Sequence, residues 1–235
     1  MKTKKKEFMS GMKVGLPIAI GYIPIAITFG LIIRTSELPL YTGILMSLFV
    51  FAGASQFIGA NLMMHGANML EIVFTTFILN FRHFLMSTSL SQRITFNTSK
   101  KLLSLISFGI TDETFAIASV QKEKSTPFKL LGLNTIAYTS WNVGTWVGLI
   151  VGGALPTVLI NSLGIALYAM FIGLLIPNFK RSKEVIVIAL IAIAISSILY
   201  WIPLFGFVSD GWRIILSTTV AAFIGANAFE MEVEQ

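Results

Sequence analysis

Ionisable residues lie inside two of the most apolar stretches of this sequence. Arg82 and His83 lie near the middle of one apolar run, and Asp112 and Glu113 lie near the middle of the next. A charge at the centre of a bilayer costs about 2.5–3.5 kcal/mol on insertion scales. Because a chain tolerates this cost when the charges face a partner or a wet cavity, the pattern indicates a transport pathway or another functional site. The alternative is an Arg–carboxylate pair that only holds two helices together.

Helical spacing sets how these side chains can meet. Asn80 and His83 share one face of a predicted helix, and Arg82 lies roughly 100° around it. Asp112 and Glu113 are consecutive, so along a regular helix their side chains also diverge by about 100°. We therefore expect one carboxylate to pair with Arg82 and the other to titrate or to meet a substrate. A proton-coupled carrier would require one of these carboxylates, or His83, to change its protonation state.

The preceding apolar run offers neutral polar groups at membrane depth. Gly53-Ala54-Ser55-Gln56 is a poor helix centre, and the run is long for a single crossing. We expect a helix break near Gly53, which would expose backbone groups beside Ser55 and Gln56. A packing face of small residues is the alternative.

Two further runs carry candidate lining residues. Pro17 and Pro24 predict a kink or helix break on either side of Tyr22. Trp141 and Asn142, near the middle of the fifth run, could line a cavity, although a packed aromatic is the more common role of such a tryptophan.

Composition identifies the class of protein. Hydrophobic residues make up 55% of the 235 residues, charged residues 12%, and the mean hydropathy is +0.81. Soluble domains carry about 25% charge. The net charge of +6 lies in short clusters between apolar runs, where it orients helices in the lipid bilayer and does not predict a nucleic-acid partner. The absence of cysteine excludes disulfides and thiolate metal sites, and we expect no metal and no cofactor.

The predicted fold is all-α: a polytopic integral membrane protein with seven or eight transmembrane helices, some of them discontinuous. A basic segment, 1–13, precedes a single transmembrane domain, 14–229, and a short acidic tail, 230–235, follows. The N-terminus is expected in the cytoplasm, although this places the Arg93–Lys101 cluster on the outer side. The expected spans are 14–33, 40–64, 69–90, 102–120, 130–154, 157–177, 185–207 and 212–229.

Four segments in order are similar to one known family. The chain resembles the AzlC family of branched-chain amino acid permeases, or LIV-E exporters, through Gly15-Leu16-Pro17 with Gly21-Tyr22-Ile23-Pro24, Phe51-Ala52-Gly53-Ala54-Ser55-Gln56-Phe57, Asn80-Phe81-Arg82-His83, and Thr111-Asp112-Glu113-Thr114. The resemblance implies a secondary carrier of the cytoplasmic membrane that exports leucine, isoleucine, valine and their analogues. It also implies a partner, a small AzlD-type membrane protein.

Two other classes of function stay open on the sequence. Ser55 and His83 could serve an intramembrane serine hydrolase, but Gly53-Ala54-Ser55-Gln56-Phe57 lacks the closing glycine of a nucleophile elbow, and we expect no enzyme. A passive channel or scaffold subunit is the other alternative. Because the sequence contains no phosphate-binding Gly-x-x-x-x-Gly-Lys-Ser/Thr loop, an ion or substrate gradient would have to drive transport.

Overall fold

The computed structural model describes residues 2–94, 98–119, 125–153, 172, 176, 179 and 182–229, and these are almost entirely helical. The all-α prediction is confirmed. Two compact units form: Met1–Ala60 with Leu79–Leu167 (unit 1), and Asn61–Ile78 with Tyr168–Gln235 (unit 2). The helices are α1 (Lys2–Thr35), α2 (Leu40–Phe49), α3 (Gly53–Met64), α4 (Met69–Ser91), α5 (Lys100–Phe108), α6 (Asp112–Ser119), α7 (Pro127–Val151), α10 (Lys183–Trp201) and α11 (Asp210–Ala228), with a 3-10 turn at Pro203–Phe205.

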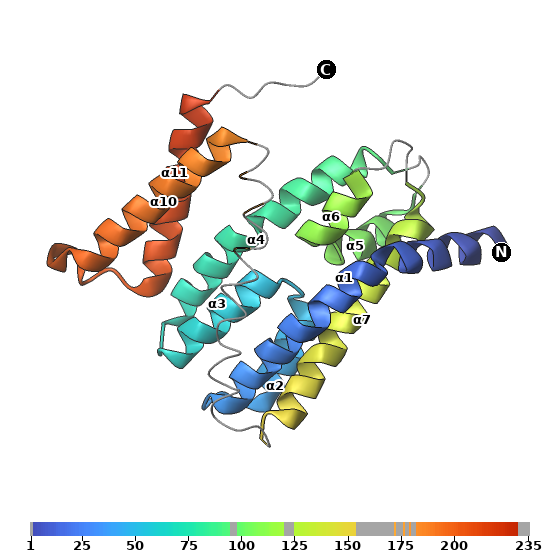
Figure 1. The fold of residues 1–235 in the computed structure, drawn as a ribbon, viewed down its shortest axis with the longest axis horizontal. Helices are drawn as coiled ribbons and strands as arrows, with labels where there is room; N and C mark the ends of the chain where they lie inside the picture. Colours follow the sequence, from blue (N-terminus) through green and yellow to red (C-terminus); the bar gives the residue numbers. More distant parts are fainter. Residues whose placement is uncertain are drawn as a thin grey trace. The chain divides into compact units, whose positions relative to one another are not determined.

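The centre of unit 1 is a pair of parallel helices, α1 and α7, which lie side by side (Figure 1). Gly11, near the start of α1, lies against the backbone of Lys129 near the start of α7. At the other end, Gly30 lies against the backbone of α7 at Gly148, and a Cβ on either glycine would collide with the opposite helix. Small residues allow this close approach, as in other membrane helix pairs.

α1 continues without interruption through both of its prolines. The predicted helix break at Pro17 and Pro24 is therefore wrong, and the alternative of a kink stays a prediction. A proline removes one N–H donor and crowds the preceding turn, which a membrane helix tolerates when neighbouring groups support it. α1 has such support because α7 packs along its length, and its helix also includes most of the basic segment 1–13.

The second predicted span is broken near Gly53, as expected, over the three residues that precede it. α2 ends at Phe49, α3 begins at Gly53, and Phe51 between them has a φ of 44°. This left-handed conformation is unfavourable for a residue with a side chain. Burial holds it, since the Phe51 ring is 2% exposed and packs on Phe108 and Tyr138.

The fourth predicted span is also two helices. α5 and α6 meet at a bend of 120° over Gly109–Thr111. The expectation that Asp112 and Glu113 lie near the middle of one span is therefore wrong: they form the first turn of α6. Carboxylates are favourable there because the N-terminus of a helix carries a partial positive charge.

Unit 2 contains the beginning of α4 and the antiparallel helices α10 and α11 (Figure 1). Glu71, 3% exposed, accepts hydrogen bonds from the Ser209 hydroxyl and, at 2.8 Å, from the Gly211 N–H at the start of α11. This carboxylate satisfies donors that the helix N-terminus leaves free. None of the residues of α10 is buried, as expected for an aliphatic helix that contacts lipid or a partner.

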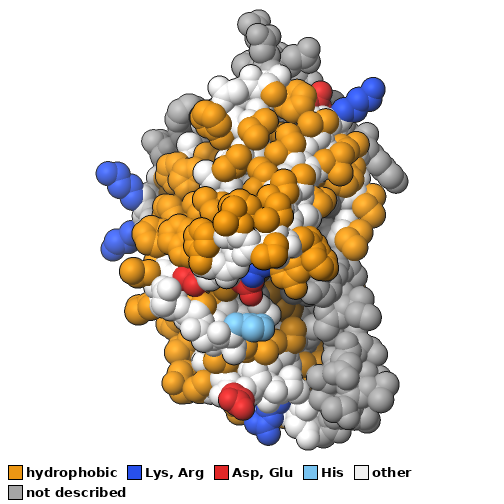
Figure 2. Space-filling view, turned by 90° about the vertical axis from the view of Figure 1, so that its left-hand side faces the viewer, with side chains coloured by type: hydrophobic (Ala, Val, Ile, Leu, Met, Phe, Trp, Pro, Cys, Tyr) orange, Lys and Arg blue, Asp and Glu red, His pale blue; other side chains and the backbone are white. Residues whose placement is uncertain are grey.

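The surface agrees with a membrane protein. α1, α4 and α10 are each long and apolar enough to cross a bilayer, and the bent pair α5–α6 has the composition of a fourth span. Hydrophobic side chains cover much of the described surface in Figure 2. The exposed apolar residues of the chain include Phe207 (84% exposed) and Ile150 (78%). The sixth predicted span, 157–177, lies outside the described residues except for positions 172 and 176, and the tail 230–235 lies outside them entirely.

Candidate functional site

The acidic pair is fixed by a small network at the start of α6. The Thr111 N–H donates to Thr114 Oγ1 at 2.8 Å, and the Thr114 N–H donates to Thr111 Oγ1 at 3.3 Å. This reciprocal arrangement resembles a capping box, in which residues at the N-cap and three positions later satisfy each other's backbone donors. It holds the intervening Asp112 and Glu113 rigidly at the helix N-terminus.

Arg82, on α4, forms an ion pair with Asp112. The Nη1 to Oδ2 distance is 2.9 Å, which confirms the predicted pair and selects Asp112 over Glu113. The side chains are 39% and 32% exposed, so the protein buries the pair only in part. Part of each charge remains accessible to a bound molecule or to water.

Glu113 has a different partner. The Tyr22 hydroxyl, on α1, donates to a carboxylate oxygen of Glu113 and lies 2.7 Å from Thr111 Oγ1. Consecutive carboxylates thus face a cation and a neutral phenol. The divergence expected from helix geometry separates the two carboxylates, although at a helix start and not in mid-span.

The two breaks of unit 1 meet at aromatic side chains of α7. The Phe51 ring, in the α2–α3 break, and the Phe108 ring, at the end of α5, both contact Tyr138, with centroids 5.1 Å and 5.8 Å away. Trp141, one turn further, packs edge-on against Tyr22 at 5.4 Å and leaves no room for a Cβ at Gly53. Gly53 therefore matters for close approach to α7, and not for a turn within the break.

The end of α5, like the break between α2 and α3, is positioned by contacts with α7. The Asn134 amide donates to the carbonyl oxygen of Ile106 at 2.8 Å, which also accepts from the Gly109 N–H at 3.1 Å. A Cβ on Gly109 would lie 2.7 Å from the Asn134 Cβ, so glycine is required at this approach. The position of the acidic turn is thus determined by contacts with α7.

The neutral polar residues belong to two further hydrogen-bonded groups. The Ser55 hydroxyl donates to Asn80 Oδ1 at 2.5 Å, which joins α3 to α4. Gln56 Nε2 donates to Ser47 Oγ at 3.0 Å, and Ser47 Oγ lies 2.8 Å from Thr145 Oγ1. Ser47 and Thr145 were not expected as site residues, because each is a single hydroxyl in an apolar run and carries no sequence signal.

Two predicted site residues form no hydrogen bond within these groups, although His83 interacts electrostatically with Arg82 and Glu113. No hydrogen bond joins His83 to any residue that the structure describes, and the Asn142 amide donates only to the Tyr138 carbonyl oxygen, at 2.9 Å, within its own helix. Seven buried side-chain polar atoms have no hydrogen-bond partner among the described residues. Four of them belong to predicted site residues, namely Gln56 Oε1, Trp141 Nε1, Asn142 Oδ1 and Arg82 Nε, and the other three belong to Thr75, Ser119 and Arg213. Such atoms are costly unless a ligand or water satisfies them.

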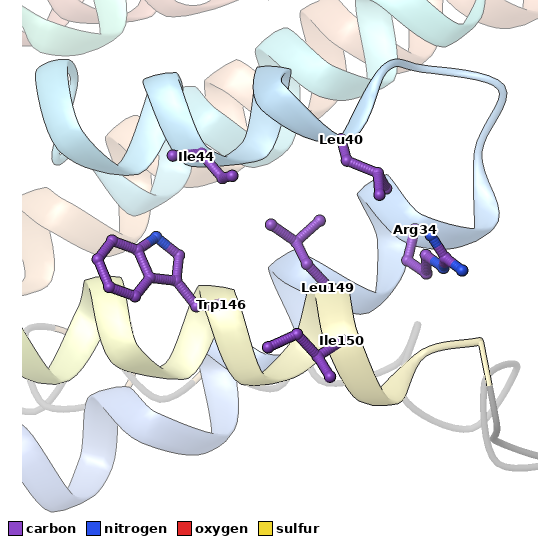
Figure 3. A pocket seen from close by; sticks show the side chains of 6 residues that line it. All are labelled: Arg34, Leu40, Ile44, Trp146, Leu149 and Ile150. Carbon is purple, nitrogen blue, oxygen red and sulfur yellow. The ribbon is translucent and has the colours of Figure 1, made fainter.

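A separate pocket of about 390 Å³ lies at the far end of α1 and α7 (Figure 3). Leu40 and Ile44 of α2 face Trp146, Leu149 and Ile150 of α7 across it. Arg34 lies at its rim, and the guanidinium points away from the apolar side chains. The pocket offers no acceptor for an ammonium group, so it does not compete with the acidic turn as a site for a zwitterion.

The fold and site thus define an all-α polytopic membrane protein whose charged and polar side chains gather where two of its helices break. The sequence model of the AzlC protein family matches residues 17–155, and the chain belongs to this family.

Several relatives extend the match over most of the chain. An uncharacterized membrane protein of Archaeoglobus fulgidus is 34% identical over 76% of this chain and 78% of its own length. The inner membrane protein YgaZ of Escherichia coli is 32% identical over 83% of each chain. The branched-chain amino acid transport protein AzlC of Bacillus subtilis is 27% identical over 75% of this chain and 70% of its own length. No solved structure matches the chain.

Proposed function

We propose that this protein is a secondary carrier that exports branched-chain amino acids across the cytoplasmic membrane. The observation that carries the proposal is the Arg82–Asp112 ion pair beside the Tyr22–Glu113 contact, at a helix break inside a membrane protein of the AzlC family. The name of the Bacillus subtilis relative supports the substrate class.

The groups around the acidic turn match the chemistry of a zwitterionic aliphatic amino acid. A carboxylate requires a cation, and Arg82 is partly accessible. An ammonium group requires acceptors, which Asp112 and Glu113 supply. In this proposal the substrate carboxylate replaces Asp112 on Arg82, and the released Asp112 then binds the substrate ammonium. The charges remain paired throughout, which avoids an isolated charge at membrane depth.

Glu113 is the residue proposed to exchange a proton during the cycle. Its partner is the Tyr22 phenol, whereas Asp112 is already paired with the Arg82 guanidinium. His83 is the less favoured candidate because it is adjacent to Arg82 in sequence, and a second cation there is unfavourable. An ion gradient would thereby drive export.

Reconstitution into proteoliposomes, with and without an AzlD-type partner, tests the proposal. We expect saturable leucine flux that unlabelled valine or isoleucine inside the vesicle stimulates. Glu113→Gln should lose uphill transport driven by a pH gradient while it retains leucine exchange. Asp112→Asn is the matched variant, and it should lose binding and exchange together. Wild-type leucine flux that does not saturate would indicate a passive channel, and normal uphill transport in both variants would refute carboxylate coupling.

A serine hydrolase receives no support from the geometry of Ser55. Its hydroxyl donates to the Asn80 amide oxygen and not to an imidazole. A nucleophile requires a general base within hydrogen-bond reach. If Ser55 has a functional role, it is in joining α3 to α4 beside the site.

A further inference from the structure

We infer that α5–α6 does not cross the membrane but forms a re-entrant hairpin, which enters and leaves at the face where α1 and α7 begin. The acidic turn then lies at the tip of this hairpin, at mid-membrane depth. This inference concerns the topology of the chain, and it does not depend on the substrate.

The two ends of the hairpin are joined to each other. Ile94, just after α4, forms a β-bridge with Ser125, just before α7, and the Ser125 N–H donates to the Arg93 carbonyl oxygen at 3.0 Å. The Arg93 side chain reaches in addition from the α4 end to the last turn of α6, where Nη1 donates to the Ser119 carbonyl oxygen at 2.7 Å. Residues on opposite faces of a hydrocarbon core of about 30 Å cannot make these contacts.

Each of the two helices is long enough to cross only about half of the hydrocarbon core of a membrane. α5 has nine residues and α6 has eight, which at 1.5 Å per residue gives ~13 Å and ~12 Å. Each is less than half of the roughly 30 Å core. The bend of 120° between them directs α6 back toward the face where α5 began.

Contacts with α1 and α7 place the tip in mid-membrane. At the open end of the hairpin, Thr126 caps the start of α7 and Lys4 of α1 lies 5.1 Å above the Phe128 ring. At the tip, Phe108 contacts Tyr138, eleven residues into α7, and Glu113 contacts Tyr22, near the middle of the apolar part of α1. Eleven residues correspond to a depth of about 17 Å.

Contacts at the open end gather positive charge on one face. The Ser125 N–H donates to the Arg93 carbonyl oxygen and Lys4 lies above the Phe128 ring, so the cluster from Arg93 to Lys101 lies beside the N-terminal lysines. The basic residues that the structure describes near the open end are Lys2, Lys4, Lys5, Lys6, Lys13, Arg93, Lys100, Lys101 and Lys129. The positive-inside rule then makes this face cytoplasmic.

Single-cysteine labelling tests the inference, because the wild-type chain contains no cysteine. Gln92→Cys and Lys129→Cys report the two ends of the hairpin, Lys5→Cys reports the N-terminal face, and Glu37→Cys, after α1, reports the opposite face. The probe is a membrane-impermeant maleimide applied to right-side-out and inverted vesicles. We expect the first three variants to label only in inverted vesicles and Glu37→Cys to label only in right-side-out vesicles. Labelling of positions 92 and 129 from opposite sides would overturn the inference.

If position 92 or 129 does not react with the maleimide, a disulfide cross-link tests the hairpin instead. The double variant Ile94→Cys/Ser125→Cys should form an intramolecular disulfide under mild oxidation, since these residues form the β-bridge. Glu37→Cys/Ser125→Cys is the matched control and should remain reduced. Failure of the first pair to cross-link in correctly inserted protein would count against the hairpin, whatever the labelling yields.

Discussion

Removal of Arg82 should destabilise the protein mainly by leaving Asp112 without a partner. Breaking a fully buried ion pair costs about 3–5 kcal/mol, whereas an exposed pair is worth about 0–1 kcal/mol. The two side chains are 39% and 32% exposed, so we expect Arg82→Ala to cost about 2 kcal/mol. Neutralising the orphaned carboxylate should recover part of this loss, and Arg82→Ala/Asp112→Asn should be more stable than Arg82→Ala by about 1 kcal/mol.

Thermal unfolding in detergent, followed by tryptophan fluorescence, measures the difference. For a chain of this size 1 kcal/mol corresponds to a Tm shift of about 2–4 °C. Arg82→Ala/Glu113→Gln is the matched control, because Glu113 is bound to Tyr22 and not to Arg82. This control should recover none of the stability that Arg82→Ala loses. Equal recovery with Glu113→Gln, or none with Asp112→Asn, would refute the assignment of the pair. Both double variants should remain inactive in leucine exchange, because each lacks the proposed carboxylate-binding group.

Three other changes test the structure around this pair. Tyr22→Phe removes the hydroxyl that donates to Glu113 and should cost about 1.5–3 kcal/mol, the range for hydrogen bonds to charged groups, measured as a lowered Tm and an altered pH dependence of leucine flux. Gly148→Val places a side chain against the backbone of α1 and should lower the Tm by an amount equivalent to about 1–3 kcal/mol, whereas Gly21→Ala, which meets nothing within 4 Å, should leave it unchanged or slightly raised. Asn134→Leu removes the donor to the end of α5, and impaired flux in protein of normal Tm is the expected result; a wild-type flux would show that the hairpin end needs no such support.

The sequence predicts the ion pair because the cost of an unpaired guanidinium is a local property. It does not identify the carboxylate, since a regular helix through 102–120 leaves Asp112 and Glu113 equally placed. The choice depends on the break at Gly109, which is created by the approach of α7 at Asn134, a contact distant in sequence.

The positions of the helix breaks also depend on contacts that the local sequence does not predict. The break before Gly53 is predictable from weak helix formers, but its exact place depends on burial of Phe51 against two aromatic rings. Pro17 and Pro24 are strong local signals, and the structure overrides them because α1 is packed along α7. Hydropathy likewise finds a bilayer-length apolar run at 102–120 and gives no sign that the chain turns back within it.

The close seam between α1 and α7 has a consequence for how such chains can diverge. Ala26 and Gly30 on one helix face Gly144 and Gly148 on the other, with the same four-residue spacing. Because the two backbones share this space, the seam restricts the combined volume of the facing side chains more than the identity of either one. Substitutions at facing positions should therefore covary. A larger side chain on one helix should be accompanied by a smaller side chain at the facing position on the other helix. A set of aligned relatives would record that exchange as paired changes about 118 residues apart, which follows from the offset between Gly30 and Gly148.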